Sequence, residues 1–308
     1  MNNSDFIVEI NKLRIEKNAV ILAHYYQIPE IQDIADFVGD SLELARKAKD
    51  SKYDIIVFAG VHFMAETAKI LNPYKKVLIP DMEAGCSLAD SCKAEDFGAF
   101  KSRYPDAIVV SYINCSADIK AMSDIICTSS NAIKVVNSIP KDRRIIFAPD
   151  VNLGNYVANV TNRELILWEG SCIVHEAYKL ESIINLKLNY PDAKLIAHPE
   201  CKTPILEISD FVGSTSALLK YVKENESNEF IVVTESGIIH QMKKNSPEKI
   251  FYNPYSDESC NCNDCKYMKM NTIEKIYNCL KNESPELLLS SELIEKAKKP
   301  ILRMLEIN

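Results

Sequence analysis

The chain has 308 residues and a mass of 34.8 kDa, which is enough for roughly two or three domains. Hydrophobic residues make up 47% and charged residues 26%, so we expect a packed globular core rather than a disordered chain. The net charge of −7 argues against a nucleic-acid partner, because such binding depends on basic side chains that neutralise phosphates.

The sequence also lacks the patterns of a membrane or secreted protein. Its longest clean apolar run, residues 55–61, is far shorter than the roughly 20 residues that cross a bilayer. The first 18 residues contain no apolar signal region before a small-residue cleavage site. We therefore expect a cytoplasmic protein with no membrane partner.

Short β-rich apolar runs alternate with helical patterns along the chain. Strands are predicted at 19–23, 55–59, 77–79, 107–111, 125–128, 145–148, 165–167, 194–197 and 231–234. Helices are predicted at 31–36, 41–49, 64–71, 116–122, 132–136, 203–209 and 217–224, and again from residue 270 onward. Several strands are unbroken apolar runs, which is typical of a parallel sheet covered by helices on both faces. The alternation predicts an α/β fold.

Three segments of the chain, 21–49, 109–136 and 195–222, repeat one pattern of elements. Each runs strand, polar or aromatic triplet, helix, short apolar strand, hydroxyl residue, helix. The first residue of the triplet precedes the hydroxyl residue by 17 positions every time: His24 and Ser41, Tyr112 and Ser129, His198 and Thr215. This register predicts three similar α/β units of about 85–90 residues around a pseudo-threefold axis.

The repeat also predicts where a ligand binds. In α/β units ligands lie outside the carboxyl ends of the strands, and every triplet follows a strand. We expect six side chains to project there: His24, Tyr26, Tyr112, Asn114, His198 and Glu200. The three hydroxyl residues each open a helix, where a hydroxyl either caps the helix or binds an anion. Three of them in register favour a ligand with several carboxylates or phosphates.

Each unit ends in a cysteine, and these are Cys86, Cys172 and Cys265, separated by 86 and 93 residues. A structural zinc site would need four ligands, whereas three thiolates suit a [4Fe–4S] cluster with one open iron. An open iron is a Lewis acid that can take a substrate hydroxyl or carboxylate. Cys260 and Cys262 compete for the third position. Cys265 is favoured because the helix-like segment after it would hold its side chain and lower the pKa of its thiol.

Alternatives remain for the other cysteines and for one histidine. The run Cys260, Cys262 and Cys265 would also suit a zinc loop, so the competing hypothesis is a three-unit α/β binding module with structural zinc at 260–265. Cys92 and Cys201 lie outside the repeat register and are interpreted as structural. His175 is either a residue that supports a cluster ligand or a core residue.

A set of motifs spread over nearly the whole chain closely resembles the quinolinate synthase family of NAD biosynthesis. The motifs are HYYQ (24–27), GDS (39–41), FAGVHFMAETAK (58–69), PDMEAGCSLAD (80–90), YINCSADIKA (112–121), CTSSNA (127–132), APDVNLG (148–154), HPEC (198–201), GSTSALL (213–219), TESGIIHQM (234–242) and CKYMKMNT (265–272). The resemblance implies condensation of iminoaspartate (iminosuccinate) with dihydroxyacetone phosphate to quinolinate, phosphate and two waters. A further enzyme that supplies iminoaspartate is a possible partner.

The resemblance also implies the architecture and the site. Three three-layer αβα sandwich domains, at 1–86, 87–172 and 173–265, would surround one [4Fe–4S] cluster held by Cys86, Cys172 and Cys265, with the helical segment 266–308 joining the first domain. Substrate binding is implied for His24, Ser41, Tyr112, Ile113, Asn114, Ser129, His198, Pro199, Glu200 and Thr215, and catalysis for Tyr26, Glu200, His24 and His198. Some relatives carry C-x-x-C-x-x-C before the Met-rich segment, whereas Ser259 takes the first place here. A regulatory dithiol role therefore stays open.

Overall fold

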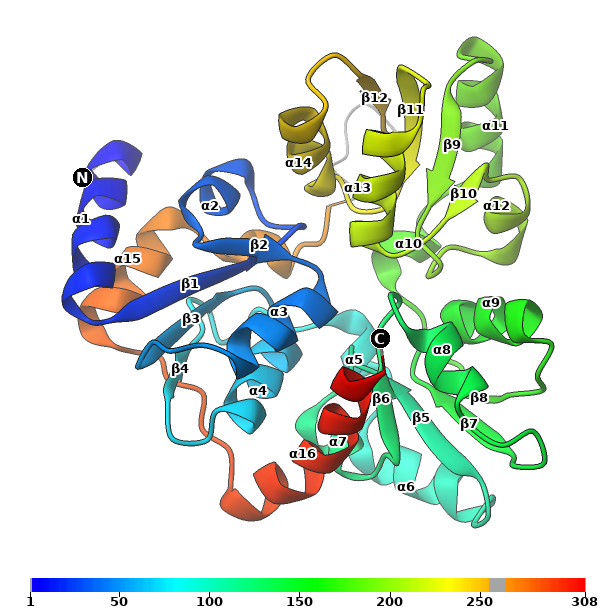
Figure 1. The fold of residues 1–308 in the computed structure, drawn as a ribbon, viewed down its shortest axis with the longest axis horizontal. Helices are drawn as coiled ribbons and strands as arrows, with labels where there is room; N and C mark the ends of the chain where they lie inside the picture. The colour runs from blue at the N-terminus through cyan, green and yellow to red at the C-terminus, as the bar shows by residue number, and fades with distance from the viewer. Residues whose placement is uncertain (1, 255–263, 308) are drawn as a thin grey trace.

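The computed structural model describes residues 2–254 and 264–307. Three four-stranded sheets, all parallel within the named strands, lie around a common centre (Figure 1). The first contains β1 (Ala19–His24), β2 (Phe37–Gly39), β3 (Ile55–Ala59) and β4 (Lys76–Leu78). The second contains β5 (Ile108–Tyr112), β6 (Ile125–Cys127), β7 (Ile145–Ala148) and β8 (Ile166–Leu167), and the third β9 (Lys194–Ala197), β10 (Phe211–Val212), β11 (Glu229–Val233) and β12 (Ile250–Tyr252).

The three sheets share one strand order. It is β2-β1-β3-β4 in the first sheet, β6-β5-β7-β8 in the second and β10-β9-β11-β12 in the third. The central strands β1, β3 and β7 are buried at every residue, because helices cover both faces of each sheet. The α/β fold of three similar sandwich units predicted from the repeat is confirmed.

Helices connect the strands within each unit. The first unit has α2 (Pro29–Ile34), α3 (Ser41–Lys49) and α4 (His62–Leu71). The second has α5 (Ser87–Asp90), α6 (Ala94–Ser102), α7 (Ala117–Ala121), α8 (Ala132–Asn137) and α9 (Val151–Thr161). The third has α10 (Ile173–Glu176), α11 (Leu180–Asn189), α12 (Thr203–Glu207), α13 (Thr215–Glu224) and α14 (Ile238–Asn245).

The ends of the chain supply covering helices to the first two units. Helix α1 (Asn3–Glu16) packs beside α15 (Ile273–Asn282), and α15 also covers β3. Helix α16 (Ser291–Glu306) crosses to the second unit, where it packs on α7 and β6, and it also contacts α4 (Figure 1). The 3₁₀ turn η1 (Met268–Met270) precedes α15. The domain boundaries given above stay predictions.

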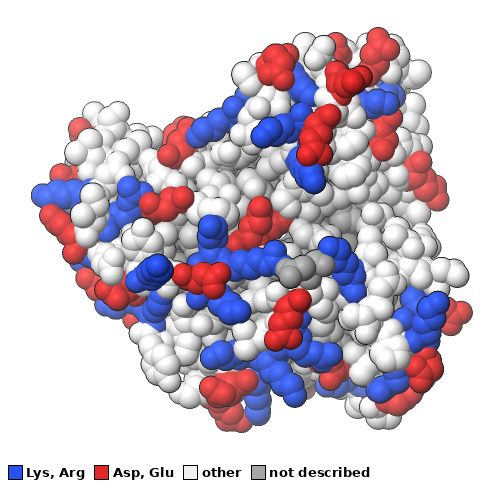
Figure 2. Space-filling model, in the orientation of Figure 1, with Lys and Arg blue, Asp and Glu red and all other residues white. Residues whose placement is uncertain are grey.

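Among the strands of the described residues, only the edge strand β12 has no predicted counterpart. It begins at Ile250, whose side chain is half exposed, so its residues show only a weak version of the apolar pattern that marks a strand. The described helices include none that is both long enough and apolar enough to cross a membrane. Acidic and basic side chains are interspersed over the three lobes on the face seen in Figure 2.

Candidate active site

A cavity lies where the three units meet. Its lining residues follow the carboxyl ends of strands from all three sheets, as the fold rule requires. Eight of the ten predicted substrate-binding residues line it, together with Tyr26 and the three predicted cysteines: His24, Ser41, Tyr112, Asn114, Ser129, His198, Glu200, Thr215, Tyr26, Cys86, Cys172 and Cys265.

Ile113 and Pro199 are the two predicted residues that do not line this cavity. Each is the middle residue of its triplet. Both are buried, and Ile113 donates its backbone N–H to the carbonyl of Cys127 at 2.8 Å. The triplets turn away from the strands that they follow, and in these two turns the middle side chain is buried outside the cavity.

His24 and His198 are held in equivalent ways in the first and third units. The Nδ1 atom of His24 accepts the backbone N–H of Tyr26 at 3.1 Å, and Nδ1 of His198 accepts that of Glu200 at 3.3 Å. Burial is the main cause that lowers the pKa of His24 to about 4 and that of His198 to about 3. Both rings are therefore neutral at pH 7 and carry their proton on Nε2. In this tautomer Nε2 is a donor for a substrate oxygen.

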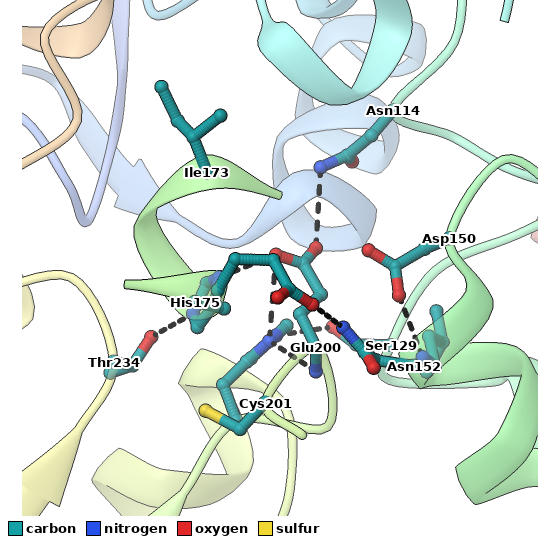
Figure 3. A network of polar contacts seen from close by, with 12 residues as sticks. Asn114, Ser129, Asp150, Asn152, Ile173, His175, Glu200, Cys201 and Thr234 are labelled. Carbon is teal, nitrogen blue, oxygen red and sulfur yellow. Dashed lines mark hydrogen bonds and ion pairs between the residues drawn. The ribbon is translucent and has the colours of Figure 1, made fainter. Parts of the chain in front are cut away.

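Glu200 lies at the centre of the polar network in Figure 3. The hydroxyl of Tyr112 donates to its Oε1 at 2.6 Å, and the amide of Asn114 lies 3.5 Å from the same oxygen. Its Oε2 is 2.7 Å from Nδ1 of His175. Burial favours a raised pKa for this carboxyl, but His175, His198 and the Tyr112 hydroxyl outweigh burial and hold the pKa well below its usual range. Glu200 is thus ionised although it is almost completely buried.

A chain of polar contacts connects Glu200 to Tyr26. The Nε2 atom of His175 lies 3.0 Å from Oγ1 of Thr234, and this oxygen lies 2.7 Å from the hydroxyl of Tyr26. His175 is buried, which also suited a core role, but its ring contacts site residues on both sides. Thr234 was not singled out from the sequence. The signal that could have found it is its position directly after β11, in the third unit.

The three register hydroxyls do not cap the helices that they open. The cap of α3 is Asp40, and that of α13 is Ser214, so Ser41 and Thr215 are the first helical residues. Ser129 lies before α8, whose cap position is Asn131. The capping interpretation is therefore wrong. All three hydroxyl residues instead line the cavity, and Ser129 Oγ lies 3.1 Å from Nε2 of His198.

The three cysteines occupy equivalent local structures. Cys86 and Cys172 are the cap residues of the short helices α5 and α10, and Cys265 comes just before the 3₁₀ turn η1. In each case a backbone N–H two or three residues later points at the sulfur and favours the thiolate. Glu235 further positions Cys265, because its Oε1 accepts the Cys265 backbone N–H at 3.1 Å.

The expected low thiol pKa of Cys265 is corrected by the structure. Burial is the largest influence and raises the pKa of Cys265 to about 11, against the opposing effect of the backbone N–H groups. Burial also raises the pKa of Cys86 to about 12 and that of Cys172 well above its usual value. A bound metal deprotonates a coordinating thiol outright, so thiolates would form on binding.

The donor set of the cavity fits a group held by three thiolates. Cys86, Cys172 and Cys265 are free thiols that line one cavity, and each comes from the end of a different unit. Among the described residues no fourth cysteine lines the cavity. Cys92 and Cys201 are buried elsewhere, in apolar clusters. Cys260 and Cys262 lie outside the described residues.

A second grouping of donors includes one of these cysteines. The ligand atoms of Cys172, His175 and Glu200 lie within 4.8 Å of one another. His175 and Glu200 already contact each other, and His175 also contacts Thr234. We interpret this group as the point where the polar network approaches the thiol end of the cavity.

Comparison with known proteins agrees with this site. The family model described as NadA, quinolinate synthetase A protein, matches residues 8–306. The chain belongs to the quinolinate synthase family. It is 59% identical to the quinolinate synthase of Microcystis aeruginosa, with 99% of this chain and 95% of the relative covered. The quinolinate synthase of Chloroherpeton thalassium is 58% identical, with 100% of this chain and 96% of the relative covered. That of Trichodesmium erythraeum is 59% identical, with 99% of this chain and 94% of the relative covered.

Membership of the quinolinate synthase family confirms the resemblance drawn from the motifs. The chain is an enzyme of NAD biosynthesis that acts on small molecules, and the family implies an iron–sulfur protein. The cysteines of the cavity can serve as metal ligands, which agrees with that implication.

Proposed function

We propose that the enzyme condenses iminoaspartate with dihydroxyacetone phosphate to quinolinate, with release of phosphate and two waters, in the cavity between the three units. The observation that carries this proposal is the convergence of anion-binding hydroxyls, neutral histidine donors, an ionised glutamate and three thiols on one cavity. The substrates carry carboxylates and a phosphate, which need several donors at once. We also propose a cytoplasmic location, since the described cysteines form no disulfide.

The hydroxyl and imidazole groups would bind and orient the substrates. Ser41, Ser129 and Thr215 each come from a different unit and can donate to a carboxylate or phosphate oxygen. The Nε2–H groups of His24 and His198 can donate to further substrate oxygens, because Nδ1 of each ring is already engaged. Because these donors are neutral, they bind an anion without adding to the site a charged group that would compete for protons.

The network around Glu200 would move protons. Its ionised carboxylate can accept a proton from substrate carbon or nitrogen and pass it to His175, 2.7 Å away. The contacts from His175 through Thr234 to Tyr26 then lead to a hydroxyl on the cavity wall. We assign Glu200 as the base and Tyr26 as the proton relay, with His175 and Thr234 between them. Tyr112 orients Glu200 through its hydroxyl.

Cys86, Cys172 and Cys265 would hold a [4Fe–4S] cluster. Bound there, the cluster would supply a Lewis-acidic iron that binds a substrate oxygen and makes a hydroxyl a better leaving group. Glu235 would keep Cys265 in place, since it accepts the backbone N–H of Cys265 and forms an ion pair with Lys269 at 2.7 Å.

An anaerobic preparation tests this proposal against the zinc-module alternative. We expect a brown protein with broad absorption near roughly 400 nm, which forms quinolinate from iminoaspartate and dihydroxyacetone phosphate. Both the spectrum and the product are measured on the same sample. A colourless protein that contains zinc and forms no quinolinate would overturn the proposal.

The three register hydroxyls give a prediction that separates binding from stability. Replacing Ser41, Ser129 or Thr215 by Ala should raise the Michaelis constants roughly tenfold, because each loses a donor to a substrate anion. The free energy of unfolding should change little, since Asp40 and Ser214 provide the caps. Steady-state kinetics and urea unfolding measure the two effects.

Thr272→Ala is the matched control for this series. Thr272 is exposed and caps α15, where its hydroxyl oxygen accepts the backbone N–H of Lys275. It is not part of the cavity lining. Its loss should lower the free energy of unfolding by about 1 kcal/mol and leave the Michaelis constants unchanged. Wild-type Michaelis constants in all three cavity variants would contradict the anion-binding assignment.

A further inference from the structure

One buried carboxylate connects the three units beside the proposed anion-binding hydroxyls. Asp40 belongs to the first unit and is 4% exposed. Its Oδ2 accepts the hydroxyl of Ser130, from the second unit, at 2.6 Å, and the hydroxyl of Ser216, from the third unit, also at 2.6 Å. These are short, charge-assisted hydrogen bonds, which are about twice as strong as neutral ones.

The remaining acceptor capacity of Asp40 is used within its own unit. Its Oδ1 accepts the backbone N–H groups of Leu42 and Glu43, each at 2.9 Å, and so caps α3. Four donors thus compensate the buried negative charge, and two of them come from other units. Without such donors, a buried carboxylate beside anion-binding sites would be unfavourable, because its negative charge would repel the anions.

The positions of the two serines follow the repeat. Ser130 directly follows the hydroxyl residue Ser129, and Ser216 directly follows Thr215. Asp40 directly precedes the third hydroxyl residue, Ser41. Each partner in the contact is therefore one peptide away from a hydroxyl that lines the cavity. In Figure 1 the helices that these residues begin or precede, α3, α8 and α13, surround the centre of the molecule.

We propose that Asp40, Ser130 and Ser216 form a latch that holds the three units together and thereby positions the three anion-binding hydroxyls relative to one another. The latch rests on the proposed function for its effect on substrate binding. Asp40 also lines the cavity, but both of its carboxylate oxygens are engaged by protein donors, so we assign it as a positioning residue. Ser130 and Ser216 occupy equivalent positions, where the first unit has Leu42, and Asp40 stands where the other units have a hydroxyl residue. The contact is therefore not threefold.

The latch predicts a specific kinetic signature. Without it, the units spend less time in the arrangement that binds substrate, and the apparent Michaelis constant rises in inverse proportion to the fraction that is competent. A bound substrate that contacts all three units restores the arrangement itself. The turnover number at saturating substrate should therefore change little. A defect confined to folding or to the reacting groups would not give this combination.

The Asp40→Asn variant tests the proposal in the reconstituted enzyme. Asparagine caps a helix as well as aspartate does, so α3 is retained, but the amide lacks the charge that both serines bind. We expect Michaelis constants raised roughly ten- to hundredfold, with the turnover number within about threefold of the starting enzyme. The Ser130→Ala plus Ser216→Ala double variant leaves Asp40 intact and should show the same change. It keeps the test valid if Asp40→Asn fails to fold.

Combining the substitutions gives the sharpest readout. The triple variant should raise the Michaelis constants no further than Asp40→Asn alone, because all three substitutions disrupt the same contact and their effects do not add. Multiplicative effects of the three substitutions, or unchanged constants in Asp40→Asn and in the double-serine variant, would overturn the latch. Ser138→Ala, at the exposed end of α8 with a hydrogen bond to its own helix, is the matched control and should change nothing.

Hydrogen exchange tests the latch without any reference to catalysis. Backbone amides in the first turns of α8 and α13 should exchange faster in Asp40→Asn than in the starting enzyme, while those of α11 should not. The latch and the proposed function would fail with different experimental results. If Ser41→Ala raises the Michaelis constants and Asp40→Asn neither raises them nor speeds exchange, the latch is wrong and the proposed function stands. Faster exchange in an enzyme that makes no quinolinate would instead reject the proposed function.

Discussion

Replacing any one of Cys86, Cys172 and Cys265 by serine should abolish both iron content and quinolinate formation. The three sulfurs line one cavity and each is held at the start of a short helical segment, so no nearby described thiol can take the place of a lost one. Serine keeps the size of the side chain but is a poor ligand for iron. Iron and sulfide are quantified after anaerobic reconstitution, together with activity.

Three further variants serve as controls for the ligand assignment. Cys279 lies in the core of the first unit on α15, so Cys279→Ser should lower stability and retain iron. Cys260→Ser and Cys262→Ser, at positions outside the described residues, should retain iron, sulfide and activity. A Cys265→Ser protein with its full iron content, beside a Cys262→Ser protein without it, would move the third ligand to Cys262.

Glu200→Gln should lower the turnover number by roughly 10²–10⁴ while iron content stays normal. Glutamine keeps the acceptor for the Tyr112 hydroxyl, but it removes the negative charge that faces His175 at 2.7 Å. The proton acceptor at the centre of the network is then lost. Single-turnover measurements with reconstituted enzyme separate this chemical defect from weaker substrate binding.

A matched glutamate on the same unit controls for this substitution. Glu207 is exposed on α12 and lies outside the cavity lining, so Glu207→Gln should have normal turnover. If Glu200→Gln also turned over normally, the base would have to be another residue. If it lacked iron, Glu200 would belong to the metal site, where the proximity of Cys172 and His175 would explain its role.

The repeat made most of the fold and the outline of the site predictable from the sequence. Side chains that follow parallel strands at equal spacing must converge, and His24, Tyr112 and His198 do so. The predicted strands and helices follow from clear periodic patterns of apolar residues, whereas the edge strand that begins at Ile250 shows too weak a pattern. Ile113 and Pro199 were included because whole triplets were transferred from the resemblance.

What the sequence could not predict depends on contacts between units or on the balance of opposing effects. The helix caps fall one residue before Ser41 and Thr215, and only the local backbone distinguishes a cap from a first helical residue. The thiol pKa of Cys265 reflects burial that outweighs nearby N–H groups, and burial depends on the complete fold. Thr234 acquires its place only because Tyr26 and His175 approach it from two units.

The way the last two helices cover the first two units determines when each part of a newly made chain can fold. The buried cluster of the first unit includes Ile273, Ile276 and Leu280 of α15, and the cluster shared by the first and second units includes Ile301 and Met304 of α16. Both therefore need residues that are made after the strands of all three sheets.

By contrast, one apolar cluster of the second unit draws only on residues 92–168, and one of the third unit only on residues 178–252. Each of these two units can therefore bury that part of its core before α15 and α16 are made. The apolar faces beneath α15 and α16 stay open to solvent until those two helices are made, and during that interval they are the surfaces on which a chaperone would act.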